Sequence, residues 1–319
     1  MIYMKYKGSY LSYLLMYLFY FMSLALLSGL ISVYLMDKGY SASQVSLVVS
    51  CSFIVSVIVQ PWIGYLNDKY HIKWVNGLIL VTTAILGIIF IFANNIYAIA
   101  IIYSLALGLF NGTKPVIERM ATLSRHQYGR IRIWGTLGYA IGSQIGGIIY
   151  QYISSEGMYL SFSAGLFICI LGIIGTQNDK TMDDEVSKIK QDDRKLWHKN
   201  FIIYIIIICI FYGITNLNTT YLPAMFQNQG IGIDKVSTII LMITLSELPL
   251  IYYSNYYMNK LTNQQMLILI FFLLLIQFGT YSFIPFNSIQ IIVSICTKAV
   301  STVIFIMLNM KIVATIVSP

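Results

Sequence analysis

Charged residues are scarce in this sequence of 319 residues. Asp, Glu, Lys and Arg make up 10% of it, whereas a soluble domain carries about 25%. Hydrophobic residues make up 58%, and the mean hydropathy is +0.75. Apolar runs of about 20 residues recur along the whole chain, and such runs are typical of transmembrane helices. The sequence therefore excludes an ordinary soluble domain and indicates a chain whose solvent is the lipid bilayer.

Cysteine and histidine are also scarce, and none of them has the spacing of a metal site. The four cysteines lie singly inside apolar runs, where Cys behaves as a small apolar residue, and the three histidines lie singly between runs. No Gly-Lys-Ser/Thr phosphate loop is present, which disfavours a pump driven by a nucleotide. The sequence thus predicts no enzyme activity, no cofactor and no metal site. The residues concerned are Cys51, Cys169, Cys209, Cys296, His71, His126 and His198.

The apolar runs predict ten transmembrane helices. Each run is continuous rather than alternating and is longer than the roughly ten residues of a barrel strand, so helices are favoured over strands. The first run is too long for a cleaved signal peptide, and no small-residue cleavage site follows it. The expected spans are 10–36, 41–63, 74–93, 96–117, 131–153, 158–176, 201–222, 234–257, 266–284 and 288–310. We therefore expect an all-α membrane protein.

The Lys and Arg residues predict how the chain is oriented. If the N-terminus lies in the cytoplasm, only Lys38 and Lys235 fall in outer loops, Lys114 and Lys298 fall inside spans, and the others lie on the inner side. Cytoplasmic loops are enriched in Lys and Arg, so we expect a multi-pass protein of the cytoplasmic membrane with its N-terminus inside. The net charge of +8 then follows from topology, and it gives no reason to expect a nucleic-acid partner.

A polar segment divides the spans into six and four. Residues 177–200 carry mixed charges without an apolar face, which is typical of a solvated linker. The expected domains are a bundle of six helices at 1–176, a cytoplasmic linker at 177–200 and a bundle of four spans at 201–319.

Two motif pairs indicate that the halves are repeats. The segments "GYSASQVS" at 39–46 and "GIGIDKVS" at 230–237 both precede an even-numbered span, 191 positions apart. The same spacing places Asp68–Lys69 opposite Asn259–Lys260. Parallel repeats about an axis along the membrane normal are a known transporter design. We therefore expect two bundles related by pseudo-two-fold symmetry.

The charged stretch after the second span has a recognisable pattern of a glycine, an acid and two basic residues. The four residues are Gly64, Asp68, Lys69 and Lys73. The pattern resembles the signature between the second and third spans of the major facilitator superfamily. This resemblance implies an inner gate, in which Asp68 pairs with charges at neighbouring helix ends when the inside is closed. The alternative is a solvated turn whose positive charges hold it in the cytoplasm.

A second pattern covers residues 118–143 and includes a Glu118–Arg119 pair. Its core is formed by Gly129, Arg130, Arg132, Trp134, Gly135, Gly138 and Tyr139. It resembles the connection between the fourth and fifth spans in the oligosaccharide and nucleoside proton-symporter (lactose-permease-like) branches of that superfamily. The resemblance implies that Arg132 contacts solute and that Tyr139 stacks on it. The alternative is that Arg132 anchors its helix at the lipid headgroups. The glycines permit close helix packing.

Three ionisable residues lie deep inside predicted spans, where charge is costly and usually functional. Lys114 stands where the resembling symporters carry a solute-binding Glu, and Lys298 lies in a tenth span that has no acid. Glu247 is the acid in the eighth span, where these symporters carry a functional Glu; the alternative role is a structural ion pair. In the superfamily that the chain resembles, spans 1, 4, 7 and 10 line the central cavity and spans 5 and 8 flank it, so the resemblance implies that these residues converge. Their excess positive charge favours an anionic solute; the alternative is a lowered Lys pKa, because burial disfavours the charged form.

The sequence therefore predicts a secondary active transporter for a small polar solute, a sugar, nucleoside or aromatic acid, coupled to protons by symport. Two alternatives remain: efflux of drugs or metabolites by proton antiport, and a truncated membrane protein that does not transport. The truncation is an expectation from the resemblance, because the superfamily has twelve spans and this chain supplies ten.

Overall fold

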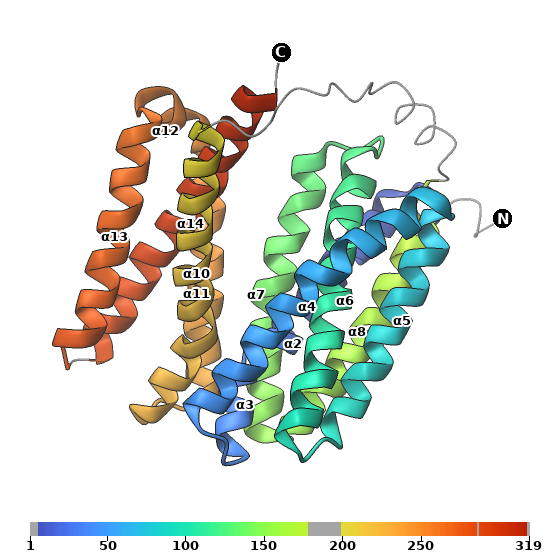
Figure 1. Ribbon diagram of the computed structural model, residues 1–319, viewed down its shortest axis with the longest axis horizontal. Helices are drawn as coiled ribbons and strands as arrows, with labels where there is room; N and C mark the ends of the chain where they lie inside the picture. The colour runs from blue at the N-terminus through green and yellow to red at the C-terminus, as the bar shows by residue number, and fades with distance from the viewer. Residues whose placement is uncertain (1–5, 178–198, 286, 318–319) are drawn as a thin grey trace.

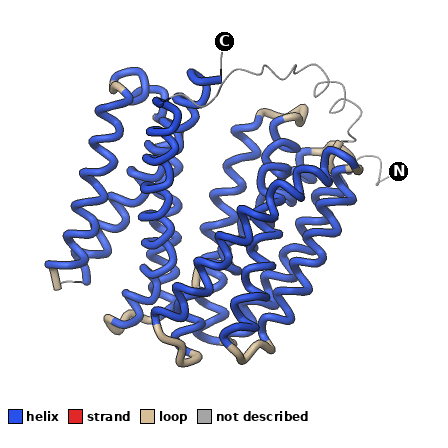
Figure 2. The backbone as a smooth tube through the Cα atoms, viewed as in Figure 1, coloured by secondary structure: helices blue, strands red, loops and turns tan. Residues whose placement is uncertain are grey.

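The computed structural model describes residues 6–177, 199–285 and 287–317, and this part of the chain is almost entirely helical and contains no strand (Figure 1 and Figure 2). The all-α fold predicted from the continuous apolar runs is confirmed. The helices are α2 (Tyr10–Ser28), α3 (Ile31–Asp37), α4 (Ala42–Lys69), α5 (Ile72–Ile91), α6 (Ile96–Thr122), α7 (Tyr128–Tyr152), α8 (Ser155–Gly175), α10 (Lys199–Asn228), α11 (Ile233–Tyr252), α12 (Ser254–Lys260), α13 (Asn263–Phe283) and α14 (Asn287–Val317).

Two helical bundles make up the molecule (Figure 1). The first contains α2–α8, in which α2 packs against α7 and α8, and α4 packs against α6. In its core Tyr20 stacks on Phe110 with the ring centroids 4.3 Å apart. The second contains α10–α14, in which α14 packs against α11 and α13, and Phe211 stacks on Phe305 at 3.6 Å. This division into two bundles is the one predicted, although most of the predicted linker at 177–200 lies outside the described residues.

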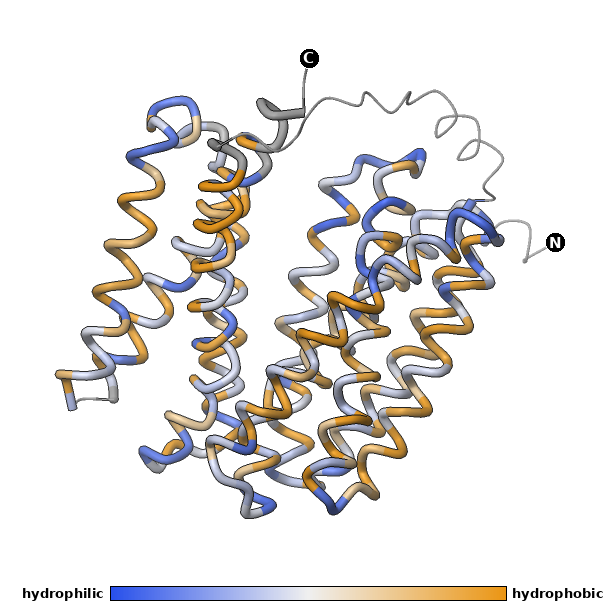
Figure 3. The backbone as a smooth tube through the Cα atoms, in the orientation of Figure 1, coloured by the Kyte–Doolittle hydropathy of each residue, from blue (hydrophilic) through white to orange (hydrophobic). Residues whose placement is uncertain are grey.

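Nine segments in the described part of the chain are long and apolar enough to cross a membrane, and the backbone in Figure 3, coloured by hydropathy, is hydrophobic along much of both bundles. Helix α7, which corresponds to the predicted span 131–153, is not one of these nine segments; it carries Arg130 and Arg132 in its first turns. Several boundaries differ from expectation. The predicted spans 10–36 and 234–257 are each divided into two helices, and α4 continues to Lys69, so most of the predicted loop at 64–74 is helical. Asn76 stabilises this turn, because its Nδ2 donates to Asn67 Oδ1 at 2.6 Å.

Close packing of α7 against α2 depends on glycine. A Cβ at Gly142 would lie 2.6 Å from the carbonyl oxygen of Met22, and one at Gly138 would overlap the carbonyl of Leu18. Small residues allow this approach between membrane helices, where van der Waals contact drives association. The glycines in the second sequence pattern therefore hold α7, with its arginines, tightly against the first helix.

The two halves use the same turn at the matched glycines. Gly39 ends α3 with φ +87° and Gly230 ends α10 with φ +83°. In both turns the amide of the residue after the glycine donates to the carbonyl five positions earlier, at 3.1 Å. This is a Schellman motif, which needs a left-handed residue that glycine adopts at little cost. The repeat found in the sequence thus has an identical backbone conformation in each bundle.

The bundles approach each other at one end and separate at the other (Figure 1). We name the two ends by their loops. The basic face carries the loops at 70–71, 123–127 and 253–262, and the opposite face carries those at 38–41, 92–95, 153–154 and 229–232. The bundles separate at the basic face and converge at the opposite face, so a space between them is open toward the basic face.

Candidate solute and proton site

A cavity of about 770 Å³ lies between the bundles at the basic face. Helix α7 forms one wall, and α11 and α14 form the other. The polar and aromatic lining includes Tyr128, Arg132, Thr136, Glu247 and Tyr252, with Val303 and Met307 contributing apolar surface. A pocket of this size with apolar walls and a few polar groups is typical of a small-molecule site.

Glu247 and Arg132 face each other across this cavity from different bundles. Glu247 is half-buried on α11, and its charge interacts with those of Arg132 on α7 and Lys298 on α14. Lys298 is also half-buried and interacts with Glu247 in turn. An ionisable group at this depth is costly unless it has a partner or a wet cavity. Glu247 lines the cavity and interacts with two cations.

Arg132 is oriented by aromatic packing. Its guanidinium lies over the ring of Phe21, 5.2 Å from the centroid, a cation–π geometry. Gly135 leaves room for this arrangement, because a Cβ there would come within 3.0 Å of Arg132 Nη1 and 2.9 Å of the Phe21 ring. Arg132 is thus held against the first bundle while it lines the cavity; a guanidinium there offers several donors to hydroxyl or carboxylate oxygens.

Lys114 and Tyr139 lie around the same charges. The exposed side chain of Lys114, on α6, interacts electrostatically with Arg132 and Glu118. Tyr139 is half-buried on α7, within electrostatic range of Glu247. Of the five residues that the sequence predicted for the solute and proton site, Arg132 and Glu247 line the cavity. Lys114, Tyr139 and Lys298 do not line it and lie within electrostatic range of these two charges or of Glu118.

Glu118 is a charged residue of this region that the sequence-based prediction did not assign to the site. Its Oε2 accepts hydrogen bonds from the hydroxyl of Tyr17 on α2 and, at 2.6 Å, from that of Tyr128 on α7. One sequence signal was available: Glu118 follows Lys114 by four positions, so both lie on the same face of α6. The two tyrosine partners come from other helices and could not have been inferred.

Comparison with known families matches residues 13–318 to the Major Facilitator Superfamily. The chain belongs to this superfamily. It is similar to the uncharacterized transporter YwbF of Bacillus subtilis (strain 168), at 25% identity over 254 residues, 77% of this chain and 63% of that protein. It is also similar to the lactose permease of Klebsiella oxytoca, at 28% identity over 145 residues, 41% of this chain and 34% of that protein. The chain thus spans less than two thirds of the length of these relatives.

Solved structures show the same superfamily fold. The nucleoside transporter NupG superposes with a TM-score of 0.71 at 15% identity, over 97% of this chain and 83% of that chain. The D-xylose-proton symporter superposes with a TM-score of 0.63 at 15% identity, over 93% of this chain and 79% of that chain. At these identities the likeness concerns the fold alone.

The residues of the superfamily gate signature contact their own bundle in this structure. Gly64, Asp68 and Lys69 are exposed near the end of α4, where the Lys69 ammonium lies 5.8 Å from the ring of Tyr65. Lys73 Nζ donates to the carbonyl of Thr176 at the end of α8, at 2.5 Å. The gate role predicted for these residues requires the basic face to be closed, and here it is open.

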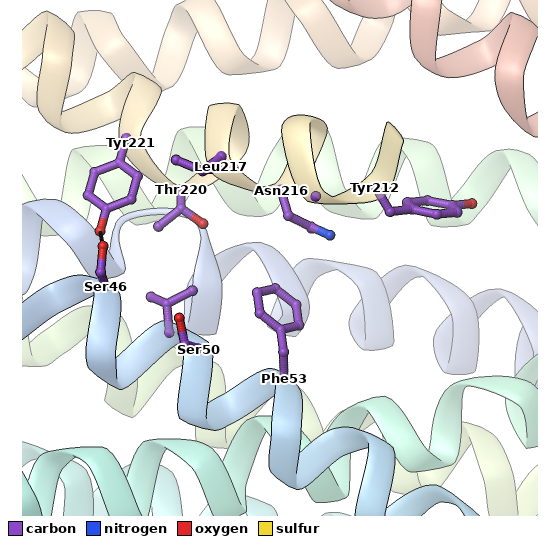
Figure 4. A pocket seen from close by; sticks show the side chains of 10 residues that line it. Ser46, Ser50, Phe53, Tyr212, Asn216, Leu217, Thr220 and Tyr221 are labelled. Atoms are coloured by element: carbon purple, nitrogen blue, oxygen red, sulfur yellow. Dashed lines mark hydrogen bonds between the residues drawn. The ribbon is translucent and has the colours of Figure 1, made fainter. Parts of the chain in front are cut away.

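Hydrogen bonds join the two bundles at the opposite face. Asp37 at the end of α3 accepts from Tyr150 of its own bundle at 2.6 Å and from Gln227 of α10 at 3.0 Å. The hydroxyls of Ser46 on α4 and Tyr221 on α10 are 2.5 Å apart. Figure 4 shows this pair at one end of a smaller pocket of about 340 Å³ between α4 and α10. The opposite face is therefore held by polar contacts between the bundles, while the larger cavity opens at the basic face.

Proposed function

We propose that this protein is a secondary active transporter that moves a small polar solute across the cytoplasmic membrane by proton symport. The observation that carries the proposal is the meeting of Arg132 and Glu247, one from each bundle, at a single cavity. A site shared by two bundles changes its access when the bundles rock against each other, which is how alternating access works in this class of transporter.

The open basic face corresponds to one end state of this cycle. Arg119, Arg125 and Arg130 lie at or near this face, which the enrichment of Lys and Arg in inner loops assigns to the cytoplasm. With that orientation the structure is the inward-facing state, closed outside by the contacts of Asp37 and Ser46. The gate signature at Asp68 and Lys69 would then act in the outward-facing state, when the basic face closes.

Glu247 is the proposed proton carrier. It is an acid at the cavity with Lys298 and Arg132 around it. Protonation removes the negative charge that attracts these two cations. The electrostatic attraction between the bundles therefore depends on whether Glu247 carries the proton. A solute that binds Arg132 and a proton that binds Glu247 therefore act on the same interface, which supports coupling.

The proposed solute is a sugar or nucleoside. Several relatives are sugar permeases by name, among them the lactose permease of Klebsiella oxytoca and the maltose permease of Geobacillus stearothermophilus. The chemistry of the site supports the same class, because Arg132 offers several donors to hydroxyl oxygens and Tyr139 offers an aromatic face. Exchange of labelled sugars and nucleosides in proteoliposomes is the direct test of this class.

An anionic solute is the second candidate, and one observation favours it. Four basic residues, Lys114, Arg130, Arg132 and Lys298, outnumber the two acids Glu118 and Glu247 around the site, which leaves two formal positive charges in excess. An unpaired cation is costly in a low-dielectric site, and a carboxylate or phosphate on the solute would balance it. Competition by paired neutral and anionic analogues distinguishes this candidate from a neutral sugar or nucleoside.

The decisive experiment measures uptake by purified protein in proteoliposomes, with and without an inward proton gradient. Glu247→Gln should abolish gradient-driven uptake while sparing counterflow exchange. Glu156→Gln is the matched control, because Glu156 begins α8 at the opposite face. Uptake by Glu247→Gln that still follows the gradient would contradict the proton role. Flux of varied hydrophobic compounds out of the cytoplasm would favour efflux instead, and no flux of any solute would favour a protein that does not transport.

A further inference from the structure

The carboxylate of Glu118 joins three helices of the first bundle next to the proposed solute site. Its Oε2 lies on α6 and accepts from Tyr17 on α2 and Tyr128 on α7. Tyr17 is fully buried, whereas Tyr128 lines the cavity. One carboxylate oxygen can accept from two hydroxyls, and hydrogen bonds to a carboxylate are stronger than those between neutral groups. Through Tyr128, the acidic side chain of Glu118 lies one residue away from the cavity wall.

Phe21 connects Glu118 to Arg132. The ring of Tyr17 packs against the ring of Phe21 with the centroids 5.5 Å apart. The guanidinium of Arg132 lies over the same Phe21 ring, 5.2 Å from its centroid. The charge of Arg132 also reaches the hydroxyls of Tyr17 and Tyr128 that hold Glu118. These contacts link Glu118 to Arg132: Glu118 holds the two tyrosines, Tyr17 packs on Phe21, and Phe21 packs on Arg132.

Charge balance gives Glu118 a second effect. Lys114 and Arg132 are cations of the same bundle and repel each other, whereas Glu118 attracts Lys114. The formal charges of Lys114, Arg132 and Glu118 sum to one net positive charge, and without Glu118 they sum to two; Arg130 at the cavity adds one more in either case. Loss of Glu118 therefore increases the repulsion between Arg132 and Lys114.

We propose that Glu118 is a positioning residue for Arg132 and sets the charge specificity of the site: its carboxylate, held by Tyr17 and Tyr128, keeps Arg132 at the cavity and limits the positive charge that the solute meets. This inference rests on the proposed transport function, because it assigns Glu118 to the same solute site.

The first test measures selectivity between solutes that differ by one charge. The probes are glucose against glucuronate and uridine against uridine monophosphate, as competitors of counterflow exchange by the full chain. Glu118→Gln should shift the ratio of affinities toward the anionic member by about tenfold, because one nearby charge is removed in a site of low dielectric. Glu118→Asp should restore most of the original ratio. Tyr128→Phe keeps the charge of Glu118 and removes one of its hydrogen bonds. It should therefore leave the ratio of affinities within about twofold of the wild type while weakening the binding of both members of each pair.

The second test needs no transported solute. Phenylglyoxal modifies arginine, and mass spectrometry of the purified protein gives its rate at each site. Glu118→Gln should change the rate at Arg132 by about threefold or more and leave the rate at Arg125 unchanged. Unchanged reactivity at Arg132, or a selectivity ratio that moves toward the neutral probe, would overturn the inference. If the wild type exchanges no probe, the proposed function fails, while the labelling result still decides whether Glu118 positions Arg132.

Discussion

Gly147 of α7 and Ser237 of α11 touch across the boundary between the two bundles. A Cβ at Gly147 would overlap the hydroxyl of Ser237 and lie 3.1 Å from the carbonyl of Ile233. This contact lies near the opposite face, where the bundles converge. Closure of that face therefore depends on the absence of a side chain at position 147, and the dependence can be tested.

Substitution Gly147→Leu should shift the protein toward the state that is open at the opposite face, because the larger side chain cannot fit against α11. The measurement is the maleimide reactivity of a cysteine introduced at Asn216, which lines the pocket between α4 and α10 at that face. Reactivity should rise severalfold. Gly279→Leu is the control, since a Cβ at Gly279 meets nothing within 4 Å. Equal reactivity in both variants would show that Gly147 does not limit closure.

Asp37 should act as a latch on the same face. Its carboxylate accepts from Tyr150 and Gln227 at the same time, so Asp37→Ala removes a hydrogen bond between the bundles. Hydrogen bonds to a charged group contribute about 1.5–3 kcal/mol. The variant should therefore populate the state open at the opposite face, measured by distances between spin labels on α3 and α10.

A double-mutant cycle isolates this contact. If Asp37 acts through Gln227, the shift caused by Gln227→Ala should be much smaller in the Asp37→Ala background than in the wild type. Fully additive shifts would mean that the two residues stabilise the closed face independently, and the latch would have to be assigned elsewhere.

The paired turns at Gly39 and Gly230 should respond alike to substitution. A left-handed conformation costs a residue with a Cβ about 1–2 kcal/mol, so Gly39→Ala and Gly230→Ala should each lower the thermal unfolding temperature. Gly77→Ala should raise it slightly, because that glycine lies inside α5 with nothing near its Cβ and alanine favours helix. If the unfolding temperature fell clearly for the substitution in one half and not for that in the other, the two turns would differ in stability although their backbone conformations match.

Glu247 and Lys298 should be coupled in stability as well as in transport. Glu247→Gln leaves Lys298 without its acidic neighbour in a half-buried site, so the unfolding temperature should fall. Adding Lys298→Met removes the unpaired cation, so most of the lost unfolding temperature should be regained. A double variant that is as unstable as the sum of the two single variants would indicate that the charges do not interact in the membrane.

The amino-acid sequence by itself indicated that the chain lies in the lipid bilayer, where its spans run and which of them contain ionisable residues. Runs of about 20 apolar residues have one stable outcome in a bilayer, because a helix satisfies its own backbone hydrogen bonds. The same logic made Lys114, Glu247 and Lys298 candidates for a functional role, since a charge inside a span is costly. The matched glycines at 39 and 230 also revealed the repeat, because the left-handed turn requires that residue type locally.

Tertiary structure alone decided which of these residues meet and which face is open. Arg132 and Glu247 are distant in sequence and share a cavity because α7 and α11 pack against each other between the bundles. Glu118 acquires its role from Tyr17 and Tyr128, and Lys73 binds the end of α8 rather than the second bundle. Periodicity and composition are local properties, whereas these contacts depend on how helices far apart in the chain are placed by packing. The family resemblance led us to expect the buried charges to converge, but the sequence could not predict the tyrosine partners of Glu118 or the contact of Lys73 with α8.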